Sequence, residues 1–220
     1  MQLAVDRTVA IEAGLVRIEG MLAIPENAQG VVLFAHGSGS GRFSPRNQFV
    51  ARELREGGLG TLLVDLLDPV ESEDRRKVFD IALLAERLLT ATEWLRSNPD
   101  TNRLSVGYFG ASTGAAAALR AVAEGAGEVR AVVSRGGRPD LAMRYLAGIS
   151  VPTLLIVGGE DYPVIQLNQE AHAALAGVAE LVIVPGATHL FEEPGALEKV
   201  AELARDWFLK YLPQEPQSSI

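Results

Sequence analysis

Short apolar runs alternate along this chain with longer segments of mixed polarity. Six runs are rich in branched residues and bounded by glycine or proline: GVVLFAH (30–36), GTLLVDL (60–66), LSVGYFG (104–110), VRAVVSR (129–135), PTLLIVGG (152–159) and AELVIVPG (179–186). Runs of this length and composition are typical of strands that are buried on both faces. We therefore predict six strands in the interior of a sheet.

The segments between these runs predict the connections. Helical patterns lie at about 44–57, 75–97, 113–125, 164–176 and 194–212, so strands and helices alternate. This alternation favours an α/β fold with a mostly parallel, doubly wound sheet. Before the first of these strands, RTVAIEA and LVRIEGMLAIP meet at Gly14, which predicts an antiparallel hairpin that opens the sheet.

Composition limits the size, compartment and partners. The 220 residues are 48% hydrophobic, which predicts one domain over 1–212 followed by a polar, proline-broken tail at 213–220. Without cysteine, a leader or a long apolar run, we expect a cytoplasmic protein. A net charge of −8 argues against nucleic acid and membrane surfaces and favours a small-molecule partner. Homo-oligomers are compatible with this surface, and no cofactor or metal is expected.

The stretch GYFGASTGAAAALR (107–120) changes from strand-like to helix-like composition at Ser112. Gly110 and Gly114 lie two positions before and after this serine, and glycine tolerates a tight turn that side chains would crowd. The pattern matches the G-x-S-x-G nucleophile elbow between a strand and a helix. Alone, it is equally compatible with a serine that merely caps an alanine-rich helix.

Two further residues follow predicted strands and give the serine a chemical context. Asp161 comes after PTLLIVGGE, and His189 lies in the loop after AELVIVPG. The carboxyl ends of parallel strands meet at one edge of a sheet, so we expect Ser112, Asp161 and His189 to lie together in the chain order of α/β-hydrolases. A histidine can take the serine proton, and a carboxylate fixes the histidine tautomer. Glu160 and Asp140 are the alternative carboxylates.

A serine nucleophile also needs N–H donors for the developing oxyanion. Thr113 follows the nucleophile and supplies one donor. The loop HGSGSGR after the strand 30–36 supplies the second, for which we choose Ser38, with Gly37 as the alternative. His36 then orients this loop, and His172 is interpreted as a surface or boundary residue.

The same loop could instead be a dinucleotide-binding fingerprint, because it follows a strand and Asp65 ends the next strand. Gly37 and Gly39 match that pattern, but Arg42 occupies the third glycine position. The segment FSPRN also delays the helix that should receive the pyrophosphate. We therefore favour the oxyanion loop.

Four arginines lie near this edge: Arg42 and Arg46 beside the loop, and Arg135 and Arg138 after a strand. An arginine fork suits carboxylate or phosphate, so Arg46 and Arg135 are candidates for binding a substrate anion. They could equally form structural ion pairs. The acids available for such pairs are Asp65, Asp68 and Asp140. The connection 66–77 could form a small lid or simply a solvated loop.

The motifs FAHGSGSGRFSPRN, GYFGASTGAAAAL, VVSRGGRPDL, LLIVGGED and VPGATHLFEEPGALE together resemble the dienelactone-hydrolase-like branch of the α/β-hydrolases, over about residues 14–212. The resemblance is strongest to the hydrolase domain sometimes fused to a phosphoribosyltransferase. It implies an α/β-hydrolase fold and a triad of Ser112, Asp161 and His189. Because the chain has 220 residues and no large insertion after the strand ending near Arg135, we expect a minimal cap. True dienelactone hydrolases typically use a cysteine nucleophile, where this chain has serine.

These observations favour a serine hydrolase that cleaves small carboxylic esters, with lactones and acidic esters included, through an acyl-enzyme. The alternative is a non-catalytic member of the same fold that binds a small molecule.

Overall fold

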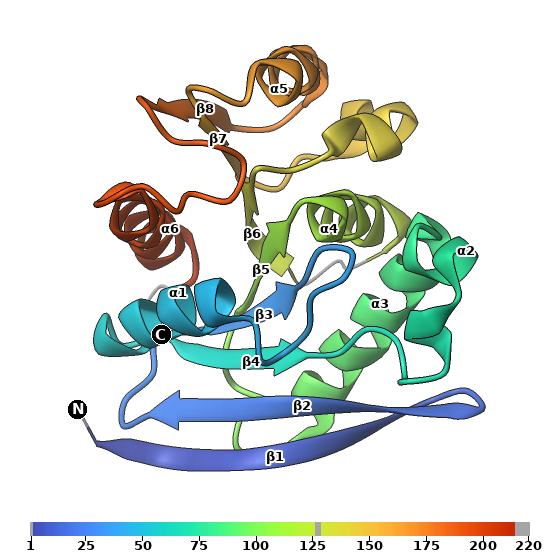
Figure 1. Cartoon of the computed structure of the whole chain (residues 1–220). Coiled ribbons are helices and arrows are strands. Elements are labelled where there is room, and N and C mark those ends of the chain that lie inside the picture. Colours follow the sequence, from blue (N-terminus) through green and yellow to red (C-terminus); the bar gives the residue numbers. More distant parts are fainter. Residues whose placement is uncertain (1, 126–128, 214–220) are drawn as a thin grey trace, which may run out of the picture.

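The computed structural model describes residues 2–125 and 129–213, which form one eight-stranded sheet covered by helices (Figure 1). The strands are β1 (Leu3–Ala13), β2 (Val16–Pro25), β3 (Val31–Ala35), β4 (Gly60–Val64), β5 (Val106–Ala111), β6 (Val129–Arg135), β7 (Thr153–Gly158) and β8 (Ala179–Val184). Their order in the sheet is β1-β2-β4-β3-β5-β6-β7-β8. The pairs β1–β2 and β2–β4 are antiparallel, and the other neighbours are parallel.

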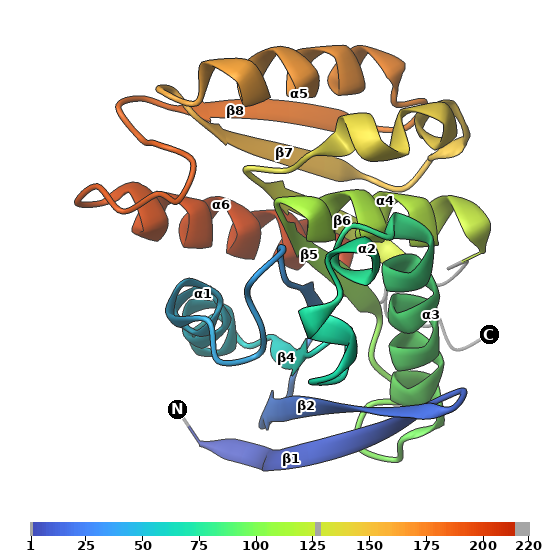
Figure 2. The same cartoon turned by 45° about the vertical axis from the view of Figure 1, so that its right-hand side comes forward.

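Helices cover both faces of this sheet. They are α1 (Pro45–Glu56), α2 (Arg75–Val78), α3 (Ile81–Ser97), α4 (Thr113–Glu124), α5 (Tyr162–Ala174) and α6 (Ala196–Tyr211), with 3₁₀ segments η1 (Glu71–Glu73) and η2 (Pro139–Gly148). Helices α1 and α6 lie on one face, and α3 and α4 lie on the other (Figures 1 and 2). The predicted mostly parallel sheet with an N-terminal antiparallel hairpin is confirmed.

Alternate residues of the central strands feed two apolar layers. Leu33 of β3 and Tyr108 of β5 face α3 and α4, whereas their chain neighbours Phe34 and Phe109 face α1 and α6. The Tyr108 hydroxyl lies 2.6 Å from the buried Thr92 hydroxyl of α3, so the phenol keeps a polar partner inside the first layer. Burial on both faces explains why these strands read as continuous apolar runs. The prediction is wrong for β8, which lies at the edge of the sheet and in which only Val184 is buried.

The structure departs from the predicted helices in one region. The segment predicted as one helix over 75–97 is broken into α2 and α3, because Phe79 and Asp80 leave the helical path. The Asp80 carboxylate accepts hydrogen bonds from the N–H groups of Ala82 and Leu83, and so caps α3. The segment η2 was not predicted. The single domain over 1–212 stays a prediction, and of the tail 213–220 only Pro213 lies within the described residues.

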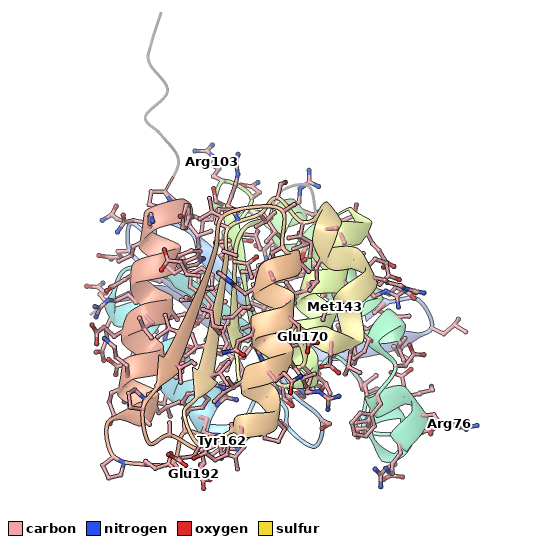
Figure 3. The ribbon with its side chains drawn as sticks, turned by 90° about the horizontal axis from the view of Figure 1, so that it is seen from above. Arg76, Arg103, Met143, Tyr162, Glu170 and Glu192 are labelled. Carbon is pink, nitrogen blue, oxygen red and sulfur yellow. The ribbon has the colours of Figure 1, made fainter. Side chains whose placement is uncertain are left out.

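The carboxyl ends of the parallel strands meet at one end of the molecule. Viewed from above, Tyr162 and Glu192 lie at this end, and Arg103, which precedes β5, lies at the opposite end (Figure 3). The loops that carry the candidate site residues therefore share one edge. In the described part of the chain, no helix combines the length and the apolar character that crossing a bilayer requires.

Candidate functional site

Ser112 occupies a strained turn between β5 and α4. Its backbone has φ 51° and ψ −120°, a conformation that a residue with a side chain rarely adopts. A methyl group on Gly110 would overlap the backbone of Ala115, and one on Gly114 would overlap the carbonyl oxygens of Ala35 and His36. Both glycines are thus required by close backbone approach, which holds the serine at the tip of the turn.

His189 and Asp161 come from two different loops and meet directly. His189 Nδ1 lies 2.6 Å from Asp161 Oδ2. The carboxylate is largely buried, with an 11% exposed side chain, whereas the imidazole is 40% exposed. The alternative acids are engaged elsewhere: Glu160 accepts a hydrogen bond from the Tyr162 hydroxyl at 2.6 Å, and Asp140 pairs with the neighbouring Arg138.

The segment after β6 contacts both the serine turn and the histidine. The Ser112 N–H donates to the carbonyl of Arg135 at 3.2 Å, and the Arg138 N–H donates to the carbonyl of Ser112 at 3.1 Å. Between them, a methyl group on Gly136 would lie 3.5 Å from His189 Nδ1 and Cε1. Ser112 and His189 therefore flank the same short segment.

The glycine-rich loop after β3 also contacts the serine turn. A methyl group on Gly37 would lie 3.0 Å from Ser112 Cβ, and the Ser38 N–H donates to Thr113 Oγ1 at 3.0 Å. As the first residue of α4, Thr113 has a backbone N–H without an intrahelical acceptor. The two N–H groups predicted as oxyanion donors thus belong to segments in direct contact.

His36 holds this loop to the neighbouring strand end. Its Nε2 accepts a hydrogen bond from the Leu66 N–H at 3.1 Å, and Nδ1 lies 3.0 Å from the carbonyl of Gly37. This pattern suits a neutral imidazole with its proton on Nδ1. Burial lowers the pKa of His36, although the Gly37 carbonyl and the Asp65 carboxylate act in the opposite direction. His172 is exposed on α5.

Hydrogen bonds within the loop that carries His189 stabilise its conformation. The Glu193 carboxylate accepts hydrogen bonds from the Thr188 N–H at 3.0 Å and the Thr188 hydroxyl at 2.7 Å. Between these residues, Phe191 is buried and has φ 56°, the left-handed conformation that side chains disfavour. This loop conformation fixes the position of His189 beyond the carboxyl ends of the strands.

A cavity of about 860 Å³ opens beside the serine turn. Thr113 and Gly37, both next to Ser112, are among its lining residues. Its remaining wall comes from the loop 38–46, from residues 65–72, and from Arg17, Glu19, Val78 and Leu84. The connection after β4 therefore forms part of the rim. A cavity of this size suits a small molecule.

The four arginines at this edge differ in their partners. Arg42 forms ion pairs with Asp65 and Glu19, and Arg138 forms a two-bond pair with Asp140 at 2.8 Å. Because Asp65 is held by Arg42, it is occupied at the position where a dinucleotide site would need a ribose ligand. These two arginines therefore have structural partners within the chain.

Arg46 and Arg135 are less satisfied. Arg46 Nη1 lies 3.2 Å from Glu192 Oε1, a carboxylate with a 64% exposed side chain, and Arg46 Nε is buried without a partner. Arg135 is 7% exposed, and its Nε and Nη1 have no hydrogen-bond partner among the described residues. Burial, together with a smaller effect of the Arg46 charge, lowers the pKa of Arg135 to about 10.

Sequence reasoning missed a buried ion pair beneath the rim. Glu71 of η1 lies 3.3 Å from Arg87 of α3, and Arg87 also donates to the carbonyl of Ala13 in β1. This contact ties the connection after β4 to the hairpin and to α3. The signal was Arg87 itself, a charged residue within the buried stripe that includes Leu84 and Leu88.

Comparisons with known proteins confirm the predicted α/β-hydrolase fold and the resemblance to the dienelactone hydrolase family. The sequence profile described as "Dienelactone hydrolase family" matches residues 18–213. A crystal structure of a dienelactone hydrolase from Anabaena variabilis is 56% identical, with a TM-score of 0.92 over 96% of this chain and 100% of that one. An esterase of Pyrococcus furiosus shares the fold at 17% identity, with a TM-score of 0.75 over 94% of this chain and 91% of that one.

Two curated relatives from strains of Mycobacterium tuberculosis are both named putative phosphoribosyl transferase. Each is 58% identical over 207 residues, which are 94% of this chain and 47% of the relative. The chain thus spans about half the length of these relatives.

Proposed function

This chain belongs to the dienelactone hydrolase family, and we propose that it is a serine hydrolase that cleaves small carboxylic esters through an acyl-enzyme on Ser112. The observation that carries this proposal is the pairing of a strained serine turn with a His189–Asp161 contact of 2.6 Å at the same sheet edge. Strain of this kind costs about 1–3 kcal/mol and is concentrated at functional sites. A non-catalytic binding protein would need no nucleophile at this turn.

The proposed reaction begins with attack of Ser112 Oγ on the ester carbonyl. His189 Nε2 takes the serine proton, because Nδ1 is held by Asp161. The same proton passes to the departing alcohol, and the acyl group remains on Ser112. His189 then takes a proton from water, whose oxygen attacks the acyl-enzyme carbonyl, and returns that proton to Ser112 Oγ as the acid is released.

We assign the oxyanion donors to the backbone N–H groups of Thr113 and Ser38. The support for this pair is that the two segments are in contact, since the Ser38 N–H donates to Thr113 Oγ1 at 3.0 Å. To stabilise the oxyanion, the Ser38 N–H must exchange this hydroxyl acceptor for the substrate oxygen. Gly37 remains the alternative source of the second donor, since it lies against Ser112.

The substrate proposed is a short ester or lactone. The cavity beside Thr113 is about 860 Å³, and residues of the connection between β4 and α3 form part of its rim. Lactones are included because the Anabaena relative is named a dienelactone hydrolase. A small-molecule partner, rather than nucleic acid or membrane, and a cytoplasmic location stay predictions.

Kinetics with p-nitrophenyl esters of graded acyl length test this function. We expect turnover to be highest for short acyl groups, and Asp161→Asn to lower kcat on the order of 10⁴-fold, because the histidine loses its orienting carboxylate. Glu160→Gln is the matched control and should change kcat little, since Glu160 faces Tyr162. If the chain is only a binding protein, no ester will be turned over, and Asp161→Asn will have nothing to lower.

A further inference from the structure

Arg135 holds its charge inside the protein without an anion. It ends β6 and is 7% exposed, and its Nε and Nη1 are buried without a hydrogen-bond partner in the described chain. Burying an unpaired charge is unfavourable, and each buried polar group without a partner calls for an explanation. One explanation is that Arg135 binds a ligand of opposite charge, and the residues around it support this explanation.

A second cation lies close to Arg135. Arg46 is the second residue of α1, and its charge lowers the pKa of Arg135, so the two guanidinium groups repel each other. The positive end of a helix dipole favours acids in the first turn, yet α1 has none there and carries Arg46 instead. The charge of Arg46 is therefore unfavourable beside Arg135 and at the positive end of α1. A bound anion would make both interactions favourable.

The acid that pairs with Arg46 does not provide the missing anion. Glu192 is the carboxylate paired with Arg46, at 3.2 Å, and its side chain is 64% exposed. Exposed pairs of this kind contribute little. By contrast, Arg42 and Arg138 at the same edge each have acidic partners in the chain. Of the four arginines at this edge, Arg135 is the one without an acidic partner among the described residues, and Arg46 is paired only with the exposed Glu192. One nitrogen of Arg42, Nε, is likewise buried without a partner, although that side chain is paired with two acids.

These two arginines lie beside the proposed reaction centre. The carbonyl of Arg135 accepts the N–H of Ser112 at 3.2 Å. Along β6, Arg135 alternates with Ser134 and shares the side of Val133, whose layer packs against α1. Arg46 lines the cavity together with Thr113. Arg135 itself is not among the lining residues, so a ligand held by both arginines would enter from the cavity past Arg46.

We propose that Arg135 and Arg46 form a subsite for a dianionic phosphate monoester group on the substrate. This inference rests on the proposed ester hydrolysis and defines its substrate class as phosphorylated esters. A dianion matches two guanidinium groups and the positive end of α1, whereas a carboxylate would neutralise only one of the cations. Arginine forks also match phosphate oxygens in a bidentate geometry.

Binding to the Ser112→Ala protein tests the subsite independently of any hydrolysis. Phenyl phosphate, benzoate and phenol are titrated by calorimetry at fixed ionic strength. We expect phenyl phosphate to bind most tightly, benzoate more weakly and phenol not measurably. Adding Arg135→Met or Arg46→Gln should weaken phenyl phosphate binding about ten- to a hundredfold, as the loss of a charged bidentate contact does. Arg138→Gln is the matched control and should leave binding unchanged.

Thermal unfolding separates this role from a structural one. If Arg135 serves a ligand, Arg135→Met removes an unpaired buried charge and should leave Tm unchanged or higher in the absence of phosphate. A lower Tm with unchanged phenyl phosphate affinity would overturn the proposal. So would benzoate binding as tightly as phenyl phosphate, or no phosphate binding at all. Because Arg46→Gln alters a partly exposed residue, it keeps the test available if Arg135→Met does not fold.

Discussion

Hydrogen bonds to neighbouring residues hold the backbone of Ser112 at a positive φ. Its N–H is held by the carbonyl of Arg135, and its carbonyl accepts from the N–H groups of Ala115 and Arg138. Hydrogen bonds on both sides of the residue offset the backbone strain and fix the direction of the side chain. The chemistry proposed for Ser112 therefore depends on its backbone surroundings as much as on its hydroxyl.

His36 illustrates a residue whose role is to keep a loop in place by remaining neutral. Protonation would remove the acceptor that Nε2 offers to the Leu66 N–H. Burial accordingly lowers the pKa of His36 below its ordinary value of 6.5. The unfolded chain then binds a proton at a higher pH than the folded one does.

The consequence is a defined loss of stability in acid. As pH falls below about 6.5, the unfolded state is protonated first, so the free energy of unfolding falls by up to about 1.4 kcal/mol per pH unit from this residue. Urea unfolding at pH 7.5 and 5.5 measures the difference. His36→Gln should reduce it, whereas the same exchange at exposed His172 should not. An equal pH dependence in wild type and His36→Gln would contradict this account of His36.

At the scale of elements, the serine turn is built from the contact between β3, β5 and α4. Alanine is normally preferred over glycine in a helix by about 1 kcal/mol. In the first turn of α4, however, the space for a methyl group at Gly114 is occupied by the carbonyl oxygens of Ala35 and His36. Close packing of the turn against β3 thus overrides intrinsic helix propensity.

Gly114→Ala should therefore destabilise the protein, by about 1–3 kcal/mol as overpacking does, and should lower ester turnover because Ser112 moves. Gly148→Ala is the matched control, since a methyl group there would meet nothing within 4 Å. Urea unfolding and kcat for a p-nitrophenyl ester measure both effects. Should Gly114→Ala match Gly148→Ala in stability and turnover, the tight packing of the turn would not be required.

Element boundaries show where sequence patterns suffice. Strands β3 to β7 were predictable because burial on both faces leaves continuous apolar runs. The break between α2 and α3 was not, although Asp80 is a suitable N-cap, because the apolar pattern continues across it. Local capping competes with periodicity there, and only the structure shows that capping prevails. The segment η2 was missed for a similar reason, since ten residues of 3₁₀ conformation have no helical period of 3.6.

At the scale of the whole molecule, the parallel topology is what turns separate motifs into a site. Ser112, Asp161 and His189 could be predicted from the sequence because each follows a strand, and parallel strands end at one edge. Asp161 and Glu160 are adjacent, so their positions alone could not show which carboxylate contacts His189. The partners of the arginines were less accessible, because pairs such as Arg46 with Glu192 join residues 146 positions apart.

Covalent labelling tests the central claim most directly. The protein is treated with a serine-directed fluorophosphonate, digested, and mapped by mass spectrometry, with Ser112→Ala as the control. We expect one label on Ser112, loss of ester hydrolysis in proportion to labelling, and neither labelling nor hydrolysis in Ser112→Ala. A label on Ser38 or Ser134 instead, or ester hydrolysis that persists in Ser112→Ala, would contradict the assignment of Ser112 as the nucleophile.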